Sequence, residues 1–509
     1  MFGLLVVAAA TIGPLFTQPS SASDLWVDAP VPDFLDWKNI ETAARLFVSA
    51  ESPAGTLPFD VELGSAAHFK HQVFAHYFPP YPVSFDNMAA GVDTYAISYL
   101  AREGEGGKYS SQGGFLRTRP LPIGPWPTRY WIQIDDAIEI LRADKMGLNG
   151  FIYDIVDVKG GRWAAGYALM LDAAAHVDPK FKLVAAPDCV ILSEADRSDI
   201  EKVLEQVWSH PSSLHLPDGR LLVAPFAAER RSVQFWAGLI AEMNARGRPI
   251  ALLPVFLDPN RYAAAFASIS YGESSWGDRD TLLPDLRLRL IKAKVVSESG
   301  LWMMPVTPQD ERPNSTIFWE ARNTYLFRRE WEEAIGNGSQ LVQLITWNDF
   351  SESTNVEPAT ATQFVYYDIG AYYAYWFKSG RKPRITKDAI YFTHRRELFD
   401  PDRVPRESDK PMHRLGGTPL TNDIEMVAFL VSPATLEIEL NGQHFRRQAP
   451  VGMETMRAPA SPGRPIFRIL RHDKPVIELS SDWSIVKQED ALDPIYVGGS
   501  SNRRFVADR

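Results

Sequence analysis

Short apolar, β-rich runs alternate with segments of helical periodicity from about residue 70 to residue 378. The β-rich runs cover residues 73–78, 150–155, 182–186, 221–224, 250–256, 267–271, 301–306 and 341–345. Apolar residues at helical spacing occupy segments such as 164–176, 199–209, 232–246, 286–297, 319–334 and 361–377. Eight strands that alternate with helices predict a (β/α)8 TIM barrel over residues 71–380.

An open, doubly wound sheet would usually have fewer strands and a glycine-rich nucleotide turn. The nearest candidate turn, residues 104–108 (GEGGK), lacks the spacing and the Ser/Thr of a phosphate loop, and no strand precedes it. It lies in a Gly-, Pro- and Arg-rich insertion at about residues 88–130, which follows the first strand. A loop in that position lies on the rim where barrel enzymes build their sites, so the insertion either walls or covers a substrate cleft.

Past residue 384 the pattern changes to short alternating strands, at 424–431, 435–440, 466–470, 476–480 and 484–487. Asn441-Gly442 is a hairpin-turn signal, because both central positions of that turn favour positive φ. The absence of long helical patterns predicts a β-sandwich at residues 385–509. Gly380 and Pro383 mark the boundary with the barrel, and residues 23–70 are expected to pack on the barrel from its N-terminal side.

Composition bounds the class of protein. With 509 residues, 45% of them hydrophobic and 23% charged, the chain is typical of a globular protein with two domains. A formal net charge of −10 argues against a nucleic-acid partner, since phosphate binding needs a clustered basic surface. We expect a monomer that needs no cofactor.

The N-terminus predicts export. An apolar stretch at residues 2–16 is followed by the small residues Ser20 and Ala22, which suit a signal-peptidase site. The stretch is too short and too interrupted by proline to span a membrane, and no other run approaches that length. We therefore expect a signal peptide at residues 1–22 and a secreted protein, extracellular or periplasmic, with a buried N-terminal segment as the alternative.

Acidic residues follow most of the predicted strands, where the side chains of a barrel point into one pocket. They are Asp154, Asp188, Glu229, Asp258, Glu273 and Asp278, and His76 ends the first strand. Each alone is more typical of a helix cap, but together they predict a site for a polar ligand. His76, Asp154, Asp188, Glu229 and Asp278 are the candidate binders of sugar hydroxyls, and the alternative for His76 is that it packs in the mouth of the barrel. No HExxH or Cys/His grouping with metal-ligand spacing is present, so no metal site is expected.

The richest motif follows the eighth predicted strand, at residues 345–353 (ITWNDFSES). It places Trp347, Asn348, Asp349 and Glu352 within six positions. A Trp ring can stack on a sugar, an amide can hold a hydroxyl, and two carboxyl groups can divide the acid and base work of glycoside hydrolysis.

This motif resembles the Ile-Thr-Trp-Asn-Asp-Tyr-Gly-Glu-Ser signature of glycoside hydrolase family 71, the α-1,3-glucanases or mutanases. Phe350 replaces the usual Tyr and Ser351 the usual Gly. Weaker similarities fall in the same order along the chain, at residues 73–76, 147–151, 181–183, 302–308 and 429–434. The resemblance covers roughly residues 70–380 and extends into the C-terminal part.

The resemblance implies that Asp349 and Glu352 are the catalytic pair of an enzyme that hydrolyses α-1,3-glucan with inversion. We expect Asp349 to activate the water and Glu352 to protonate the leaving oxygen, although the two roles could be reversed. Trp347 and Trp276 are the candidate stacking platforms, and Asn348 the candidate partner of a sugar hydroxyl.

Two alternatives remain open. The same barrel could act on another polysaccharide, such as an α-mannan, because a few rim residues can change sugar preference. The chain could also be a non-catalytic glycan-binding protein, although the presence of both Asp349 and Glu352 argues against it.

Overall fold

The computed structural model describes residues 36–53, 55–61, 71–161, 163–280, 300–400, 402, 410–488 and 493–503. The predicted signal peptide at 1–22, the helix predicted at 286–297 and part of the segment at 23–70 lie outside these residues. Among the described helices, none combines the length and the apolar character needed to cross a membrane.

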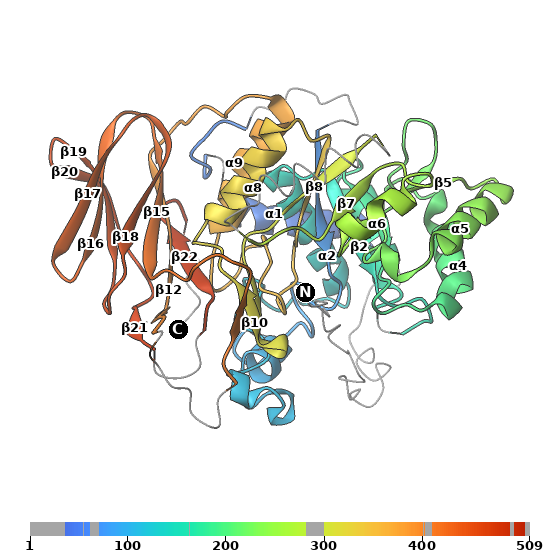
Figure 1. The fold of residues 1–509 in the computed structure, drawn as a ribbon, viewed down its shortest axis with the longest axis horizontal. Coiled ribbons are helices and arrows are strands. Elements are labelled where there is room, and N and C mark those ends of the chain that lie inside the picture. Colours follow the sequence, from blue (N-terminus) through green and yellow to red (C-terminus); the bar gives the residue numbers. More distant parts are fainter. Residues whose placement is uncertain are drawn as a thin grey trace.

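A parallel sheet organises residues 72–344 of the described chain (Figure 1). Its hydrogen-bonded order is β5 (Ile250–Leu252), β4 (Leu221–Val223), β3 (Lys182–Pro187), β2 (Gly150–Ile155), β1 (Gln72–Tyr77), β11 (Leu341–Leu344), β8 (Trp302–Val306), β7 (Glu273–Ser275) and β6 (Val255–Phe256). The sheet is strongly curled, because its two end strands, β5 and β6, are separated along the chain by Leu253 and Pro254 alone. The predicted α/β class is therefore confirmed.

The two faces of the sheet bury different clusters, because successive side chains of a strand point to opposite sides. The inner cluster contains Phe74, Ile152, Val184, Leu222, Ala251, Met303 and Ile345. The outer cluster takes alternate strand residues, such as Val73 and Phe151, and joins them to the helices. The inner face therefore continues toward the carboxyl ends of the strands, where the predicted acids lie.

Helices cover the outer face. They are α2 (Trp131–Met146), α3 (Gly166–Val177), α4 (Arg197–Trp208), α5 (Val233–Ala245), α6 (Pro259–Phe266), α8 (Tyr325–Gly336) and α9 (Val365–Ser379), and α1 (Trp37–Glu51) packs on α2. Ser232 and Asp258 begin α5 and α6 by accepting hydrogen bonds from backbone amides in the first turn. Gly380, with φ of 72°, ends α9 in the left-handed conformation that glycine tolerates.

The sixth predicted strand was wrong. Residues 267–271 alternate in polarity, but they form the turn after α6, and the strand is β7 at Glu273–Ser275. Its central residue is satisfied inside the sheet, since the Ser274 hydroxyl donates to the carbonyl of Met303 and accepts from the Gln343 amide. Hydrophobic periodicity cannot detect a strand that is held by such bonds. The helix predicted from residue 319 also begins later, at Tyr325.

Two antiparallel sheets follow α9. One has the order β18 (Gly452–Pro459), β15 (Asp423–Leu430), β12 (Ala389–Arg395), β22 (Tyr496–Ser500), and the other β17 (Gln443–Ala449), β16 (Ala434–Leu440), β19 (Ile466–Arg471), β20 (Lys474–Ser480). They share one apolar core, with Phe392, Met426, Ile438 and Phe467 among its residues. Asn441 (φ 53°) and Gly442 (φ 75°) join β16 to β17, which confirms the predicted hairpin. The sequence patterns missed β12, β17, β18 and β22.

A smaller sheet joins distant parts of the chain. β9 (Asp310–Arg312) pairs with β10 (Ile317–Trp319), and β10 pairs in turn with β14 (His413–Leu415), which comes from beyond β12. The remaining short elements are β13 (Glu397–Leu398), β21 (Val486–Lys487), a π-helical turn at Tyr95–Tyr99, and 3-10 turns at Glu105–Gly107, Ser110–Gln112, Glu194–Asp196, Ala228–Arg230 and Pro313–Ser315.

Buried ion pairs fix the antiparallel sheets to the parallel-sheet part. Glu425 of β15 accepts hydrogen bonds from the Thr324 amide at 2.9 Å and from Arg328 of α8 at 3.1 Å. Arg395 of β12 pairs with Glu320 at 2.8 Å, and the Tyr496 hydroxyl donates to the same carboxylate at 2.6 Å. Such pairs need several partners to offset their desolvation, and here each carboxylate has more than one.

Candidate active site

Asp349 lies in the turn that follows β11. Its Oδ1 accepts hydrogen bonds from the amides of Ser351 at 3.0 Å and Glu352 at 3.2 Å, and from the Ser351 hydroxyl at 2.7 Å. The Asp349 amide donates to the Thr346 hydroxyl at 2.7 Å. The motif sequence thus closes its own turn, and this turn fixes the Asp349 carboxylate at a residue exposure of 7%.

Glu352 is held by one side chain of β9 and one from the loop after β7. Its Oε1 forms an ion pair with Arg312 at 2.8 Å, and its Oε2 accepts a longer hydrogen bond from Trp276 Nε1 at 3.4 Å. Its side chain keeps 20% exposure, more than Asp349 retains. Among the described hydrogen bonds, none joins the carboxyl groups of Asp349 and Glu352 to each other. The two acids are therefore oriented by separate sets of partners.

Burial raises the pKa of both acids. For Asp349 the rise is opposed by the hydrogen bond from Ser351 and by the charge of Arg312. For Glu352, Arg312 also opposes it, while repulsion from Asp349 and Asp310 adds to it, so its pKa is the higher of the two. Two acids with different proton affinities at one place are what general acid–base catalysis needs.

The first three strands bring further polar groups to the same end of the inner face. His76 Nε2 lies 3.5 Å from Asp154 Oδ1, and the His76 ring meets the Trp276 ring edge-on at 4.8 Å. Burial lowers the pKa of His76 to about 4, so the ring is neutral at physiological pH. Asp188 Oδ1 accepts from the Val190 amide at 2.6 Å, and burial raises its pKa to about 8. His76, Asp154, Asp188 and Trp276 are thus brought together, as the sequence predicted.

Comparison with known proteins decides the family. The family model of glycosyl hydrolase family 71 matches residues 127–492, which is most of the chain. The chain belongs to glycosyl hydrolase family 71.

Two curated relatives agree with the family 71 match. The chain is 24% identical over 375 residues to a glucan endo-1,3-alpha-glucosidase of Schizosaccharomyces pombe, an alignment that covers 67% of this chain and 84% of that protein. It is 22% identical over 375 residues to a mutanase of Penicillium rubens, with 68% and 80% covered. Among solved structures, the GH99 endo-alpha-mannosidase of Bacteroides thetaiotaomicron aligns over 61% of this chain and 99% of its own, with 16% identity and a TM-score of 0.48. The first two comparisons make this chain a glycoside hydrolase.

Two predicted binding residues of this family 71 chain are not available to a ligand. Trp347 is fully buried in the outer cluster, where its ring packs on Phe151 and its Nε1 donates to Glu139 of α2 at 2.7 Å. The Asn348 amide is occupied by backbone, since Oδ1 accepts from the Phe78 amide at 2.7 Å and Nδ2 donates to the Tyr81 carbonyl at 2.7 Å. The prediction that Trp347 stacks on a sugar and Asn348 holds a hydroxyl was wrong, and both residues instead anchor the turn that carries Asp349.

Trp276 and Glu229 are two further predicted binders, and both are held by contacts with neighbouring residues. Trp276 keeps 9% exposure, because its ring packs on His76 and Phe226, and its Nε1 donates to Glu352. Glu229 Oε1 accepts the amides of Leu257 at 2.7 Å and Asp258 at 2.9 Å, which ties the loops after β4 and β6 together. Its Oε2 is buried without a hydrogen-bond partner.

Asp278 is a half-buried residue in the loop after β7. Its Oδ1 accepts the Asp280 amide at 3.2 Å. The structure therefore gives Asp278 a role in shaping its own loop, and no described hydrogen bond links it to Asp349 or Glu352.

Two arginines of the site, Arg312 and Arg279, were not predicted from the sequence. Arg312 follows β8 by six positions and reaches Glu352 because β9 and β10 form a hairpin at the rim. Arg279, after β7, belongs to the same group through Asp310. The sequence feature that could have indicated these arginines is the polar run Asp310-Glu311-Arg312, which follows the seventh predicted strand.

The insertion at 88–130 packs against the turn at residues 345–353. Phe350, which stands where the family signature has Tyr, is buried in an aromatic cluster with Tyr81, Phe85, Tyr95 and Tyr99. Backbone hydrogen bonds continue this contact, since the Leu121 amide donates to the Pro358 carbonyl and the Thr360 amide to the Arg119 carbonyl. The insertion therefore braces the turn that carries Asp349, and the Phe350 ring needs no polar partner there.

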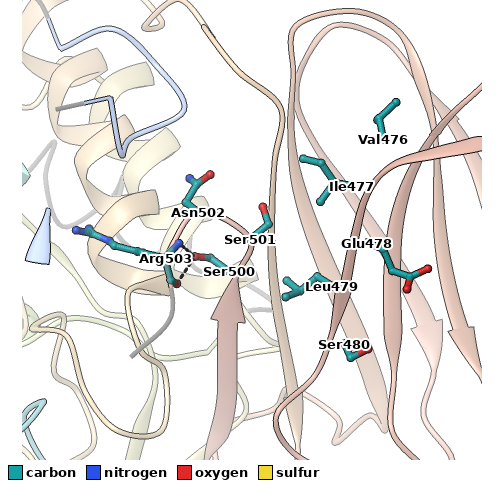
Figure 2. Close-up of a pocket in the computed structure, with 9 residues that line it drawn as sticks. All are labelled: Val476, Ile477, Glu478, Leu479, Ser480, Ser500, Ser501, Asn502 and Arg503. Atoms are coloured by element: carbon teal, nitrogen blue, oxygen red, sulfur yellow. Dashed lines mark hydrogen bonds between the residues drawn. The ribbon is translucent and has the colours of Figure 1, made fainter. Parts of the chain in front are cut away.

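Other cavities lie away from the acid pair. Figure 2 shows one of about 700 Å³ between β20 and the end of β22, lined by residues 476–480 and 500–503. Its Arg503 is ion-paired with Asp368 of α9. A second, of about 380 Å³, lies between the insertion and the C-terminal part and includes Arg117 and Asp493. Neither cavity is lined by Asp349 or Glu352.

One group in the described part of the chain has the spacing of metal ligands, namely Glu437, Glu439 and His444, whose ligand atoms lie within 4.8 Å of one another. Arg468 already pairs with both carboxylates, with Glu437 at 2.8 Å and with Glu439 at 2.5 Å. Arg446 adds a second cation to Glu437 at 2.5 Å. Because arginine neutralises these acids, the group is explained as a surface ion-pair network across the strands.

Proposed function

We propose that this chain is a secreted, monomeric α-1,3-glucan hydrolase in which Asp349 and Glu352 are the catalytic pair. The observation that carries the proposal is the placement of two acids of raised pKa, oriented by separate partners, at the carboxyl ends of parallel strands. The family and the two named relatives support the α-1,3-glucan as substrate.

The finer architecture is part of this proposal. We propose a closed (β/α)8 barrel at residues 71–380, because β5 pairs with β4 while β6, two residues later, pairs with β7. Residues 250–256 would then form one bent strand, which joins both ends of the sheet. We further propose a β-sandwich at 385–509, supported by the apolar core that the two antiparallel sheets share.

We propose that Glu352 is the general acid and Asp349 the general base. Glu352 has the higher pKa and the more exposed carboxyl group, as a donor to a glycosidic oxygen requires. Asp349 accepts three hydrogen bonds on one oxygen, which favour its ionised form and leave Oδ2 to hold a water. Asp154, Asp188 and His76 would bind sugar hydroxyls beside them.

A substrate panel tests the reaction. The purified protein should release reducing ends from α-1,3-glucan and little from α-1,4-glucan, α-1,6-glucan or α-mannan, with Glu352→Gln as the inactive control. Release from α-mannan alone would move the substrate to another polysaccharide. Binding to glucan without release by the unaltered protein would identify a non-catalytic glycan-binding protein.

The first product should be the β-anomer. Inverting enzymes hold their carboxyl groups about 6.5–9.5 Å apart to admit a water, whereas retaining enzymes hold them about 5–5.5 Å apart. The resemblance of the motif at residues 345–353 to the family signature favours the wider arrangement, and the separate partners of Asp349 and Glu352 are compatible with it. NMR of freshly cleaved α-1,3-glucan should show the β-anomer before mutarotation, and an initial α-anomer signal would mean retention.

A further inference from the structure

Arg312 is the cation in direct contact with Glu352, and its own position is fixed. Its NH1 lies 2.8 Å from Glu352 Oε1, while its Nε and NH2 donate to the two oxygens of Asp310, each at 2.7 Å. A bidentate Arg–carboxylate pair fixes the plane of the guanidinium. The nitrogen that is left over therefore points at Glu352 in a defined direction.

A second layer of contacts holds this arrangement. Asp310 is fully buried and also accepts a hydrogen bond from Arg279 Nε at 2.9 Å. The Arg312 guanidinium lies over the Trp319 ring of β10, 5.2 Å from its centroid. Because Arg312 is already held by Asp310 and Trp319, its contact with Glu352 is not needed to keep the arginine in place.

We propose that Arg312 is a positioning residue that acts through Glu352, fixing the orientation of its carboxyl group and stabilising the carboxylate that remains after the proton has left. This proposal rests on the function proposed above. Glu352 gives its proton to the leaving glycosidic oxygen, Asp349 takes a proton from the attacking water, and exchange with bulk water restores both groups. The ion pair with Arg312 is stronger once Glu352 carries its negative charge, so the contact favours proton donation in the transition state.

The charged groups around Glu352 determine in which direction its pKa changes when Arg312 is replaced. The groups that face it are Asp349 on its own turn, Asp310 and Arg312 on β9, Arg279 after β7, and the neutral His76 on β1. Without Arg312, the repulsion from Asp349 and Asp310 would be left with less compensation, and the pKa of Glu352 would rise further. A general acid of higher pKa stays protonated to higher pH, so the alkaline limb of the pH–rate profile should move upward.

The test measures kcat/KM against pH on α-1,3-glucan for four variants. Arg312→Met should lower kcat about tenfold or more, as loss of a charged contact at a reacting group does, and should move the alkaline limb upward. Arg312→Lys should restore part of the shift, because it keeps the charge. Asp310→Asn removes a repelling charge and should move the same limb downward. Arg117→Met is the matched control, since this buried rim arginine lies by Glu311 and Asp493 rather than Glu352, and its limbs should not move.

Each result of these measurements either supports the proposed role of Arg312 or overturns it. Opposite shifts of the alkaline limb in Arg312→Met and Asp310→Asn support the proposal. A shift confined to the acid limb would make Glu352 the base and overturn it. An unchanged profile in Arg312→Met, or an equal shift in Arg117→Met, overturns it. Should Arg312→Met not fold, the Asp310→Asn and Arg312→Lys profiles still decide. Failure of the proposed function would show earlier, as an unaltered protein that releases nothing from any glucan.

Discussion

Replacing Asp349 by Asn, or Glu352 by Gln, is expected to lower turnover on α-1,3-glucan at least about a hundredfold, the usual loss when a general acid or base is removed. The amides keep the shape of the carboxyls, but neither can give or take the proton. Turnover of purified protein, measured by reducing-end release at saturating substrate, checks the expectation. Near-normal turnover in either folded variant would remove that residue from the pair.

The same variants should not lose stability. Burial raises the pKa of both acids in the folded protein above its unfolded value, so each carboxyl disfavours folding once pH rises above the unfolded pKa. An amide removes that penalty, and the melting temperature near neutral pH should stay the same or rise. Asp258→Asn is the matched control, because Asp258 is an exposed rim acid that caps α6 and Asn caps equally well. Its turnover should stay near that of the unaltered protein.

Trp347→Ala is expected to lower the free energy of unfolding by about 3–5 kcal/mol, the range for large-to-small changes in a packed core. The ring is fully buried against Phe151, and its loss also leaves Glu139 without the indole donor. Urea denaturation followed by circular dichroism measures the change. A small loss of stability together with a large rise in KM would instead restore the sugar-stacking role that the motif suggested.

Two tryptophan variants serve as controls for that measurement. Trp347→Phe keeps most of the ring volume and loses the bond to Glu139, so its loss should be clearly smaller than that of Trp347→Ala. Trp376→Ala, on α9, removes the same side chain from a partly exposed position and should also cost less. Equal losses in all three variants would contradict the view that packing of Trp347 dominates.

The sequence located most of the parallel strands because a strand buried on both faces reads as an apolar run. β7 escaped detection because it is polar and is held through Ser274 by hydrogen bonds inside the sheet. The acids after β2 and β3, His76 of β1 and the pair after β11 could be located from the sequence, since residues at the carboxyl ends of parallel strands must share one rim. Their shared position could thus be predicted from the sequence.

The direction in which a side chain points after a strand ends could not be predicted. The alternation stops at Leu344, and the turn that follows sends Trp347 outward to α2 and Asn348 to the backbone of the first loop. The run at residues 310–312 marks polar residues after the seventh strand, but the contact of Arg312 with Glu352 could not be predicted, because it depends on the hairpin of β9 and β10. Contacts of this kind appear only when the loops are placed in space.

The pairing of β14 with β10 bears on how this architecture can be inherited or re-engineered. β14 lies about a hundred residues beyond β10 in the sequence, yet it completes the sheet whose other edge, β9, carries Arg312. The Gly417 amide and the Thr418 hydroxyl then bind Asp280 on the parallel-sheet side, each at 2.8 Å. Dividing the chain between α9 and β12 would therefore not yield two exchangeable modules, because the sheet beside Glu352 is built from strands on both sides of that cut.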